Sequence, residues 1–212
     1  MTEETQWRKC SHCHEVKAIE SFGVKNAAKD RINPKCKQCV CDYQNQRNQL
    51  PEVYIYNKNK SQKRRAILKE LPHSLTIQEW KNIKQRFNNC CFLTGKVLIE
   101  SKLSIEHVIP IATGHGGHIK ENVLPLDISL NMARKDKNIF EWFYTLDANE
   151  DMKRRFSEAI DYLAFMNEMS VKEYKEFVYY CDRFRRTVEE VKVTERTSRE
   201  LFEEWKELAR IR

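Results

Sequence analysis

Four cysteines near the N-terminus constrain the fold of this chain more than any other feature. Cys10 and Cys13 form one C-x-x-C pair, Cys36 and Cys39 form a second, and twenty-two residues separate the two pairs. Four thiolates presented by two such tight turns complete a closed tetrahedron around one Zn²⁺ ion. A closed site leaves no open position for a substrate. We therefore predict a structural zinc site in a zinc-binding module over residues 1–41.

Metal binding and folding are coupled in this module, because residues 1–41 contain few large apolar side chains that could form a core without zinc. Other possible ligands lie close by in the sequence. His12, His14 and Cys41 are the alternatives to members of the two pairs.

The chain has the composition of a protein of the reducing cytosol. Its first residues, MTEETQWRK, include acids and lack the apolar region of a secretory signal. It contains no run of about 20 apolar residues, so we expect no membrane partner. Eight cysteines in a cytoplasmic protein are more consistent with metal ligands than with disulfides.

The net charge of +7 is concentrated in two segments. Residues 8–41 carry eight Lys or Arg against three acids, and residues 57–69 carry six against none. Such local basic excess favours a polyanionic partner, with a solvated helix face as the alternative.

Residues 42–75 form a predicted basic helical arm or linker. Pro51 interrupts this segment, and the stretch that follows reads as a helix that Pro72 ends. Basic side chains alternate with tyrosines, a pattern that favours contacts with nucleic-acid phosphates. The predicted DNA-binding residues of the arm are Lys58, Lys60, Lys63, Arg64 and Arg65. An exposed linker helix is the alternative.

A capping box, Thr76 with Glu79, opens the next predicted helix, and its apolar residues recur at helical spacing up to Phe87. Short strands are predicted over residues 97–99 and 103–111, and a helix begins at Ser129 after a glycine-rich turn.

An acid and a histidine, Glu106 and His107, interrupt the apolar run SIEHVIP. Burying a charge costs several kcal/mol unless a partner compensates for it. Either the two residues form an ion pair at a strand edge, or they serve a metal ion and a base.

The order and spacing of Glu106-His107, Asn122 and Asn131 resemble those of the HNH nucleases, which have a ββα-metal fold. The flanking sequences EHVIP, ENVLPL and N-x-x-R-x-D-K agree, as does Glu141-Trp142. Zinc knuckles, a basic arm and this segment together look like a phage-type free-standing HNH endonuclease. The resemblance covers roughly residues 8–145.

The sequence departs from the family pattern at three places. Glu106 stands where Asp is more common, and Asn131 stands where many members have His, as in the HNH domain of CRISPR effector nucleases. Only Cys90-Cys91 remains where many members carry further C-x-x-C pairs, so we expect no second zinc site there.

The resemblance implies a hydrolase for DNA phosphodiester bonds in a bacterial cytosol or a phage-infected host. Glu106 and Asn131 would bind Mg²⁺ or Mn²⁺, since such hard cations prefer oxygen ligands. His107 would act as the general base, facing away from Glu106 because side chains alternate along a strand. Asn122 would hold the loop that positions the base. Further phosphate contacts would come from Arg134, Lys135 and Lys137, at the start of the helix that begins at Ser129.

One such site cuts one strand of double-stranded DNA, so a monomer nicks and a dimer cuts both strands. His115 and His118 lie in the glycine-rich loop and are expected to be surface residues rather than ligands.

The predicted fold is α+β and mostly helical, with an HNH core at residues 76–145 and a helical C-terminal region at residues 146–212. Aromatic residues recur at helical spacing in that region, which predicts packing against the core; a homodimer interface is the alternative. The rival functions are a non-catalytic zinc-containing nucleic-acid-binding protein and a zinc module that binds protein partners.

Overall fold

The computed structural model describes residues 6–26 and 31–211, so residues 1–5 and 27–30 of the predicted zinc module lie outside it. The described chain is α+β and mostly helical, with small two-stranded sheets. It divides into two compact units between Tyr54 and Ile55. No helix in the described part is both long enough and apolar enough to cross a membrane.

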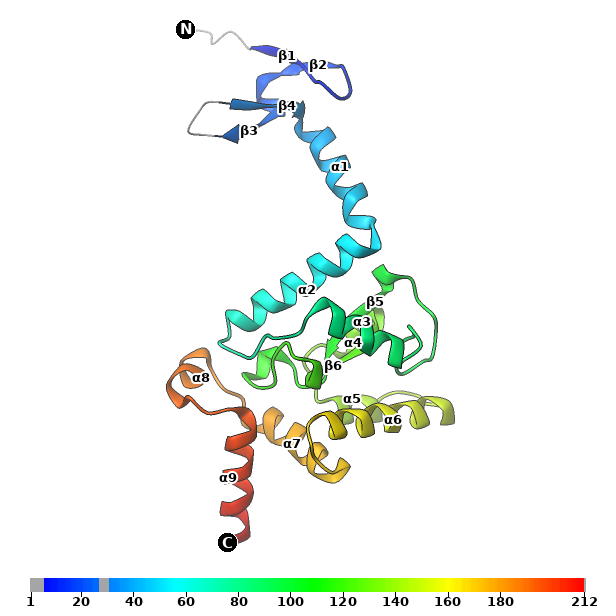
Figure 1. Cartoon of the computed structure of the whole chain (residues 1–212), viewed down its shortest axis with the longest axis vertical. Helices are drawn as coiled ribbons and strands as arrows, with labels where there is room; N and C mark the ends of the chain where they lie inside the picture. The colour runs from blue at the N-terminus through cyan, green and yellow to red at the C-terminus, as the bar shows by residue number, and fades with distance from the viewer. Residues whose placement is uncertain (1–5, 27–30, 212) are drawn as a thin grey trace. The chain divides into compact units, whose positions relative to one another are not determined.

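The N-terminal unit consists of two hairpins followed by a helix (Figure 1). The hairpins pair β1 (Trp7–Lys9) with β2 (Val16–Ala18), and β3 (Phe22–Asn26) with β4 (Arg31–Cys36). Helix α1 (Lys37–Gln49) begins directly after β4. The predicted boundary at residue 41 therefore falls inside a helix.

Helix α2 (Pro51–Ile67) is the helix predicted for the basic arm, but it ends at Ile67, several residues before Pro72. Pro51 occupies its first turn, where the missing N–H has no helical partner to lose. Ile55, Asn59 and Ala66 lie on one buried face of the helix. From Ile55 on, α2 is therefore part of the second unit and packs within it along this face.

Helix α3 (Ile77–Arg86) begins and ends as the sequence predicts. Thr76 Oγ1 accepts from Glu79 N at 3.1 Å, and Thr76 N donates to the Glu79 carboxylate at 2.9 Å, which confirms the capping box. Asn88 and Asn89 follow the helix with positive φ angles, a backbone conformation that asparagine tolerates better than most residues.

The centre of the second unit is an antiparallel hairpin of β5 (Leu103–His107) and β6 (Val123–Asp127), followed at once by helix α4 (Ile128–Arg134). Ile105 pairs with Pro125, and the Pro125 carbonyl accepts from Phe92 N at 2.7 Å. Two strands and a helix thus follow one another in the chain, with a long loop between the strands.

The strand predicted at residues 97–99 is wrong. Val97 makes a single bridge with Cys90, and Val97 and Ile99 are 79% and 70% exposed. An apolar triplet without a partner strand or a core to cover it does not form a sheet. The strand predicted over 103–111 ends at His107, because a short 3-10 turn at Ile111–Thr113 follows Pro110.

Two apolar clusters enclose the hairpin. One joins Ile105 and Val123 to residues of α2 and α3. The other joins the hairpin to the C-terminal helices, of which α6 and α7 pack together (Figure 1). These helices are α5 (Ile139–Tyr144), α6 (Glu150–Met166), α7 (Val171–Arg183), α8 (Val188–Thr194) and α9 (Ser198–Ile211).

Burial of a large apolar side chain stabilises a fold by about 1.5–3 kcal/mol, so the two clusters hold β5 firmly. Cys91 and Cys181 are buried in the larger cluster, whereas Cys90 is only half-buried and lies outside it.

Candidate functional site

The four predicted zinc ligands come together in the N-terminal unit. The Sγ atoms of Cys10, Cys13, Cys36 and Cys39 all lie within 4.8 Å of one another. Cys10 and Cys13 lie in the β1–β2 turn, Cys36 ends β4, and Cys39 lies in the first turn of α1. This cluster could hold a structural metal ion such as zinc. His12, the nearest alternative ligand, is exposed and contributes only its backbone N–H, 3.4 Å from Cys10 Sγ.

The thiols of this cluster differ in acidity. Burial raises the pKa of Cys10, but backbone N–H groups, of Cys36 first, outweigh burial and lower the pKa to about 5. Hydrogen bonding with Cys36 and burial raise the pKa of Cys39 to about 12. Thiols this close titrate as a coupled group, and a divalent cation is what allows all of them to ionise together. The donor set therefore fits Zn²⁺.

In the second unit, Glu106 faces helix α4. The Asn131 side chain hydrogen-bonds the Glu106 carboxylate, and Asn131 Nδ2 also donates to Ser104 Oγ at 2.9 Å. Glu106 is only 3% exposed. Burial raises the pKa of Glu106, while Arg134 and Asn131 partly offset this rise. The carboxylate and the amide that were predicted to share a cation lie side by side.

Arg134 does not lie at the start of a helix, which is the position predicted for it from the sequence. Helix α4 ends at Arg134, so Arg134, Lys135 and Lys137 follow its C-terminal end instead of lining its N-terminus. The Arg134 guanidinium is buried and forms an ion pair with Glu106. It also donates to the carbonyl oxygens of His107 and Val108, at 2.8 and 2.6 Å. Since all these partners are internal, Arg134 is not available to a phosphate.

His107 is the last residue of β5, and its side chain contacts the loop between β5 and β6. Its Nε2 atom lies 3.0 Å from His118 Nδ1, and His118 Nε2 lies 2.7 Å from Asn59 Oδ1 on α2. Burial, and after it the charges of neighbouring groups including Arg65, hold the pKa of His107 well below its usual value. The imidazole is therefore neutral near pH 7.

The two loop histidines are not surface residues. His115 and His118 are fully buried. His115 Nε2 lies 2.7 Å from the Phe184 carbonyl, and its Nδ1 lies 3.0 Å from Ser198 Oγ. The glycines allow the loop to fold inward, and burial lowers the pKa of each histidine to about 4.

The Asn122 side chain hydrogen-bonds the loop between β5 and β6 at two positions. Its Oδ1 accepts from Ile109 N at 2.8 Å, and its Nδ2 donates to the carbonyl oxygens of Ile109 and Gly117, each at 2.9 Å. Through these hydrogen bonds Asn122 holds the backbone of the loop between β5 and β6. A Cβ atom at Gly116 would lie 2.6 Å from Asn122 Nδ2, so the loop has no room for a larger residue there.

One cavity of about 350 Å³ gathers three of the four predicted catalytic residues, whereas Asn122 lines a different cavity. Glu106, His107 and Asn131 all line it, although the first two leave β5 in different directions. Arg65 from α2 and Lys135 from beyond α4 line the same cavity and are exposed. Two of the predicted DNA contacts thus lie beside the predicted catalytic groups.

The other predicted DNA contacts of α2 surround this cavity less closely. Lys60, Lys63 and Arg64 are exposed, and Lys58 is half-buried. Lys137 is exposed but does not line the cavity. Cationic side chains therefore follow the solvent side of α2.

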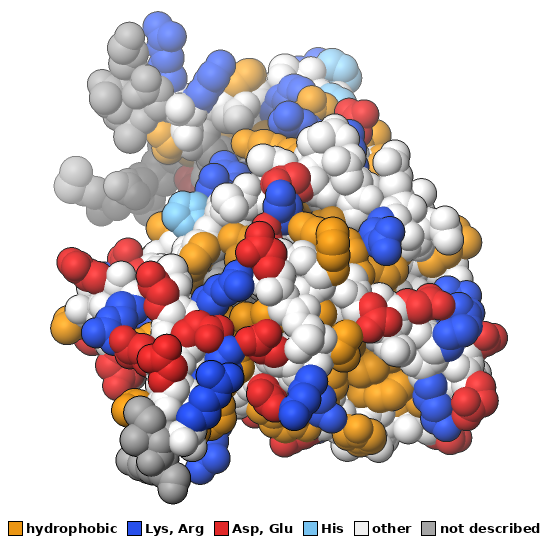
Figure 2. Space-filling view, turned by 60° about the horizontal axis from the view of Figure 1, so that its bottom comes forward, with side chains coloured by type: hydrophobic (Ala, Val, Ile, Leu, Met, Phe, Trp, Pro, Cys, Tyr) orange, Lys and Arg blue, Asp and Glu red, His pale blue; other side chains and the backbone are white. Residues whose placement is uncertain are grey.

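The surface near the C-terminal helices carries charges of both signs. Figure 2 shows acidic and basic side chains mixed on that face. Ion pairs of this kind include Lys206 with Glu203 at 2.8 Å and Arg196 with Glu204 at 2.5 Å. A surface of mixed charge does not attract a polyanion as a whole, which favours α2 as the basic side.

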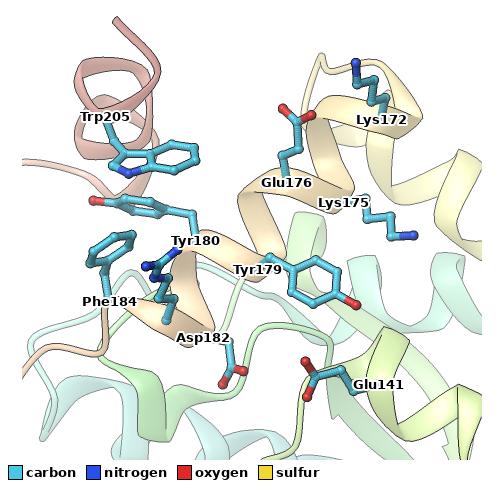
Figure 3. Close-up of a pocket in the computed structure, with 10 residues that line it drawn as sticks. Glu141, Lys172, Lys175, Glu176, Tyr179, Tyr180, Asp182, Phe184 and Trp205 are labelled. Carbon is cyan, nitrogen blue, oxygen red and sulfur yellow. The ribbon is translucent and has the colours of Figure 1, made fainter. Parts of the chain in front are cut away.

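A larger cavity of about 560 Å³ lies among α5, α7 and α9 (Figure 3). Figure 3 shows Tyr180, Phe184 and Trp205 grouped at one end, with Glu141 and Tyr179 at the other. No predicted site residue lines it. The aromatic rings contact one another, with Tyr180 and Phe184 centroids 4.9 Å apart, as in a packed core edge.

No functional role is predicted from the sequence for Asn59 or His118, which the structure places behind His107. One signal was present for Asn59: it shares the helical face of Ile55 and Ala66, and a polar residue on a buried face needs a partner. His118 carried no comparable signal, because its partners come from distant segments.

Comparisons with protein-family models, with curated proteins and with solved structures found no match for this chain.

Proposed function

We propose that this protein is a divalent-metal-dependent DNA endonuclease of the HNH type. The observation that supports this function best is the cavity of about 350 Å³ that gathers Glu106, His107 and Asn131. A carboxylate, a neutral imidazole and an amide in one cavity, with cationic side chains beside them, suit the hydrolysis of a phosphodiester.

His107 is the proposed general base. Burial keeps the imidazole neutral, so one ring nitrogen has a lone pair that can take a proton from water. The resulting hydroxide attacks phosphorus, and the 3′ oxygen leaves. A bound phosphodiester brings a negative charge close to the ring, which raises the pKa of His107 and strengthens it as a base.

Glu106 and Asn131 are the proposed ligands of a Mg²⁺ or Mn²⁺ ion. Magnesium in proteins is held by one or two carboxylates plus substrate phosphates and keeps several waters, so this small oxygen donor set fits. When bound, the ion would neutralise charge on the phosphate and on the leaving oxygen. Arg134 holds one oxygen of the Glu106 carboxylate, which fixes the direction of the other.

DNA binding is assigned to the exposed cations of α2 together with Lys135. Arg65 and Lys135 lie beside the cavity, and Lys60, Lys63 and Arg64 extend the basic surface along α2. Phosphate contacts dominate such binding, so it weakens steeply with salt. One site of this kind nicks DNA, and two copies would be needed to cut both strands.

The four-cysteine cluster is proposed to bind a structural Zn²⁺ ion. Four thiolates close a tetrahedral site, so the ion stabilises the N-terminal unit and takes no part in hydrolysis.

A non-catalytic nucleic-acid-binding protein is the second candidate. The observation that favours it is the burial of the site: Glu106 is 3% exposed and ion-paired, and His107 is 8% exposed. Turnover would require the cavity to admit a phosphate to groups that are now almost covered.

A plasmid assay separates the two candidates. Supercoiled plasmid is incubated with the protein and Mg²⁺ or Mn²⁺, and in parallel with EDTA. The nuclease proposal expects relaxed circles with metal only. We expect His107→Ala, which removes the base, to abolish nicking while the protein still binds DNA. We expect Glu106→Ala to lose the metal-dependent activity. Nicking by His107→Ala near the wild-type rate excludes the proposed base.

The DNA surface is tested with a matched pair of variants. Arg65→Ala removes a cation beside the cavity, whereas Arg154→Ala removes an exposed cation of α6 that pairs with Glu158. We expect Arg65→Ala to weaken plasmid retention and to lower its salt dependence, and Arg154→Ala to bind like the wild type. Equal DNA binding by both variants would show that α2 is not the surface that binds DNA.

A further inference from the structure

His118 and Asn59 form a chain of polar contacts behind His107 that the proposed hydrolysis does not use. The contacts run from Leu75 through Asn59 and His118 to His107. We propose that His118, oriented by Asn59, fixes the tautomer and the ring orientation of His107 so that Nδ1 is the nitrogen that takes the proton. This inference rests on the proposed nuclease function and names a positioning residue for it.

The donor and the acceptor of each of these hydrogen bonds can be assigned by starting at Leu75, where the series ends. The Leu75 carbonyl can only accept, so the Asn59 amide must present Nδ2 to it, over 3.4 Å. Asn59 Oδ1 then faces His118 Nε2 at 2.7 Å and can only accept from it. His118 therefore carries a proton on Nε2.

A neutral histidine carries one ring proton, so His118 Nδ1 has a lone pair. Burial, with nearby Lys63 and His73, lowers the pKa of His118 to about 4 and keeps it neutral. Its Nδ1 lies 3.0 Å from His107 Nε2 and accepts from it. His107 thus carries its proton on Nε2, and Nδ1 is free to act as the base.

Backbone hydrogen bonds also fix the position of His118. His118 N donates to the Pro72 carbonyl at 2.8 Å, and the His118 carbonyl accepts from Leu75 N at 3.0 Å. A Cβ atom at Gly117 would lie 2.4 Å from the Pro72 carbonyl oxygen, so only glycine allows this close approach. The segment that follows α2 therefore fixes where His118 can point.

Neither His118 nor Asn59 lines the cavity that contains the proposed catalytic groups. Both act through His107 and would not touch DNA. A hydrogen-bond partner that fixes the tautomer and direction of a reacting histidine contributes substantially to activity; for metal-bound histidines such partners are worth about 10–100-fold.

The first measurement is the tautomer itself, read from ¹⁵N shifts of the six histidines in the full-length protein, with His107→Gln assigning the His107 signals. We expect the proton of wild-type His107 on Nε2. In His118→Phe, which offers no acceptor, we expect a mixture of tautomers. A proton on Nδ1 in the wild type overturns the inference, whatever the nuclease activity.

The second measurement is nicking under saturating DNA. We expect His118→Phe and Asn59→Leu to nick about 10–100-fold more slowly with unchanged DNA affinity. His118→Gln keeps an acceptor for His107 Nε2 and should recover most of the rate.

The matched control is His115→Phe, because His115 is a buried histidine of the same loop that contacts Phe184 and Ser198 instead of His107. It should retain the wild-type tautomer of His107 and a rate within about threefold of the wild type, as expected where no partner of the base is removed.

The outcomes keep the two proposals apart. A wild type that does not nick with either metal refutes the nuclease function, while the ¹⁵N spectrum still decides the tautomer. An active wild type whose His118→Phe variant nicks at the same rate refutes the positioning role. If His118→Phe fails to fold, Asn59→Leu and the wild-type spectrum give the same decision.

Discussion

Replacing Arg134 by methionine should destabilise the second unit more than any surface substitution in it. The Arg134 guanidinium is 1% exposed and is bound to the Glu106 carboxylate and to the carbonyl oxygens of His107 and Val108. Methionine keeps much of the volume of the side chain but none of its donors. Glu106 would be left as a buried charge without its partner.

The expected loss follows from that burial. Removing one member of a buried ion pair costs about 3–5 kcal/mol of unfolding free energy, because the remaining charge keeps its desolvation cost. Burial already raises the pKa of Glu106, and the loss of Arg134 would raise it further. A carboxyl whose pKa is raised by folding stabilises the fold at low pH and loses that contribution as pH rises. The loss in Arg134→Met is therefore larger at pH 8 than at pH 5.

Urea unfolding followed by tryptophan fluorescence measures this loss at both pH values. The matched control is the double variant Glu106→Leu with Arg134→Met, which removes both charges. Apolar replacement of a whole buried pair is often close to neutral, so the double variant should lose less than Arg134→Met alone. A loss below about 1 kcal/mol in Arg134→Met, or a double variant less stable than the single, would refute the buried ion pair as described.

Three further outcomes are expected. Cys36→Ser should abolish zinc binding, measured by elemental analysis of the purified protein, because three thiolates no longer close the site; full zinc content in this variant would exclude Cys36 as a ligand. Gly116→Ala should slow nicking by at least about tenfold, since its φ is +67° and its Cβ would displace the Asn122 amide; an unchanged rate would separate the loop from catalysis. Folding lowers the pKa of His115 and His118 from 6.5 to about 4, so the unfolded chain takes up protons first and stability is lost as pH falls from about 6.5 to 4. Thermal melts across that range should show this loss, and His115→Gln should reduce it; a flat profile in the wild type would contradict the burial of both histidines.

Local signals in the sequence predicted local structure well. The spacing of Cys10, Cys13, Cys36 and Cys39 predicted the cluster because two short turns decide which atoms converge. The capping box at Thr76 predicted the start of α3 because cap and helix lie within four residues of each other. Each cysteine pair spans only four residues, as the capping box does, although twenty-two residues separate the two pairs.

The partners of the proposed base could not be predicted in this way. Asn59 and His118 are far apart in sequence and meet only because α2 packs against the loop between β5 and β6. The sequence predicts phosphate contacts for Arg134 because it places this basic residue at the start of a helix, and helix ends are the least certain part of a sequence-based prediction. Its burial depends on how α4 lies against β5.

Pro125 affects how readily the β5–β6 hairpin can pair with a strand of another chain. A two-stranded sheet has open edges, and an open edge can pair with another chain and lead to aggregation. Proline cannot donate a backbone hydrogen bond, and the carbonyl of Pro125 is already bound to Phe92 N. At Pro125 the outer side of β6 therefore offers neither a donor nor a free acceptor to an incoming strand, which disfavours pairing of the hairpin with a second chain.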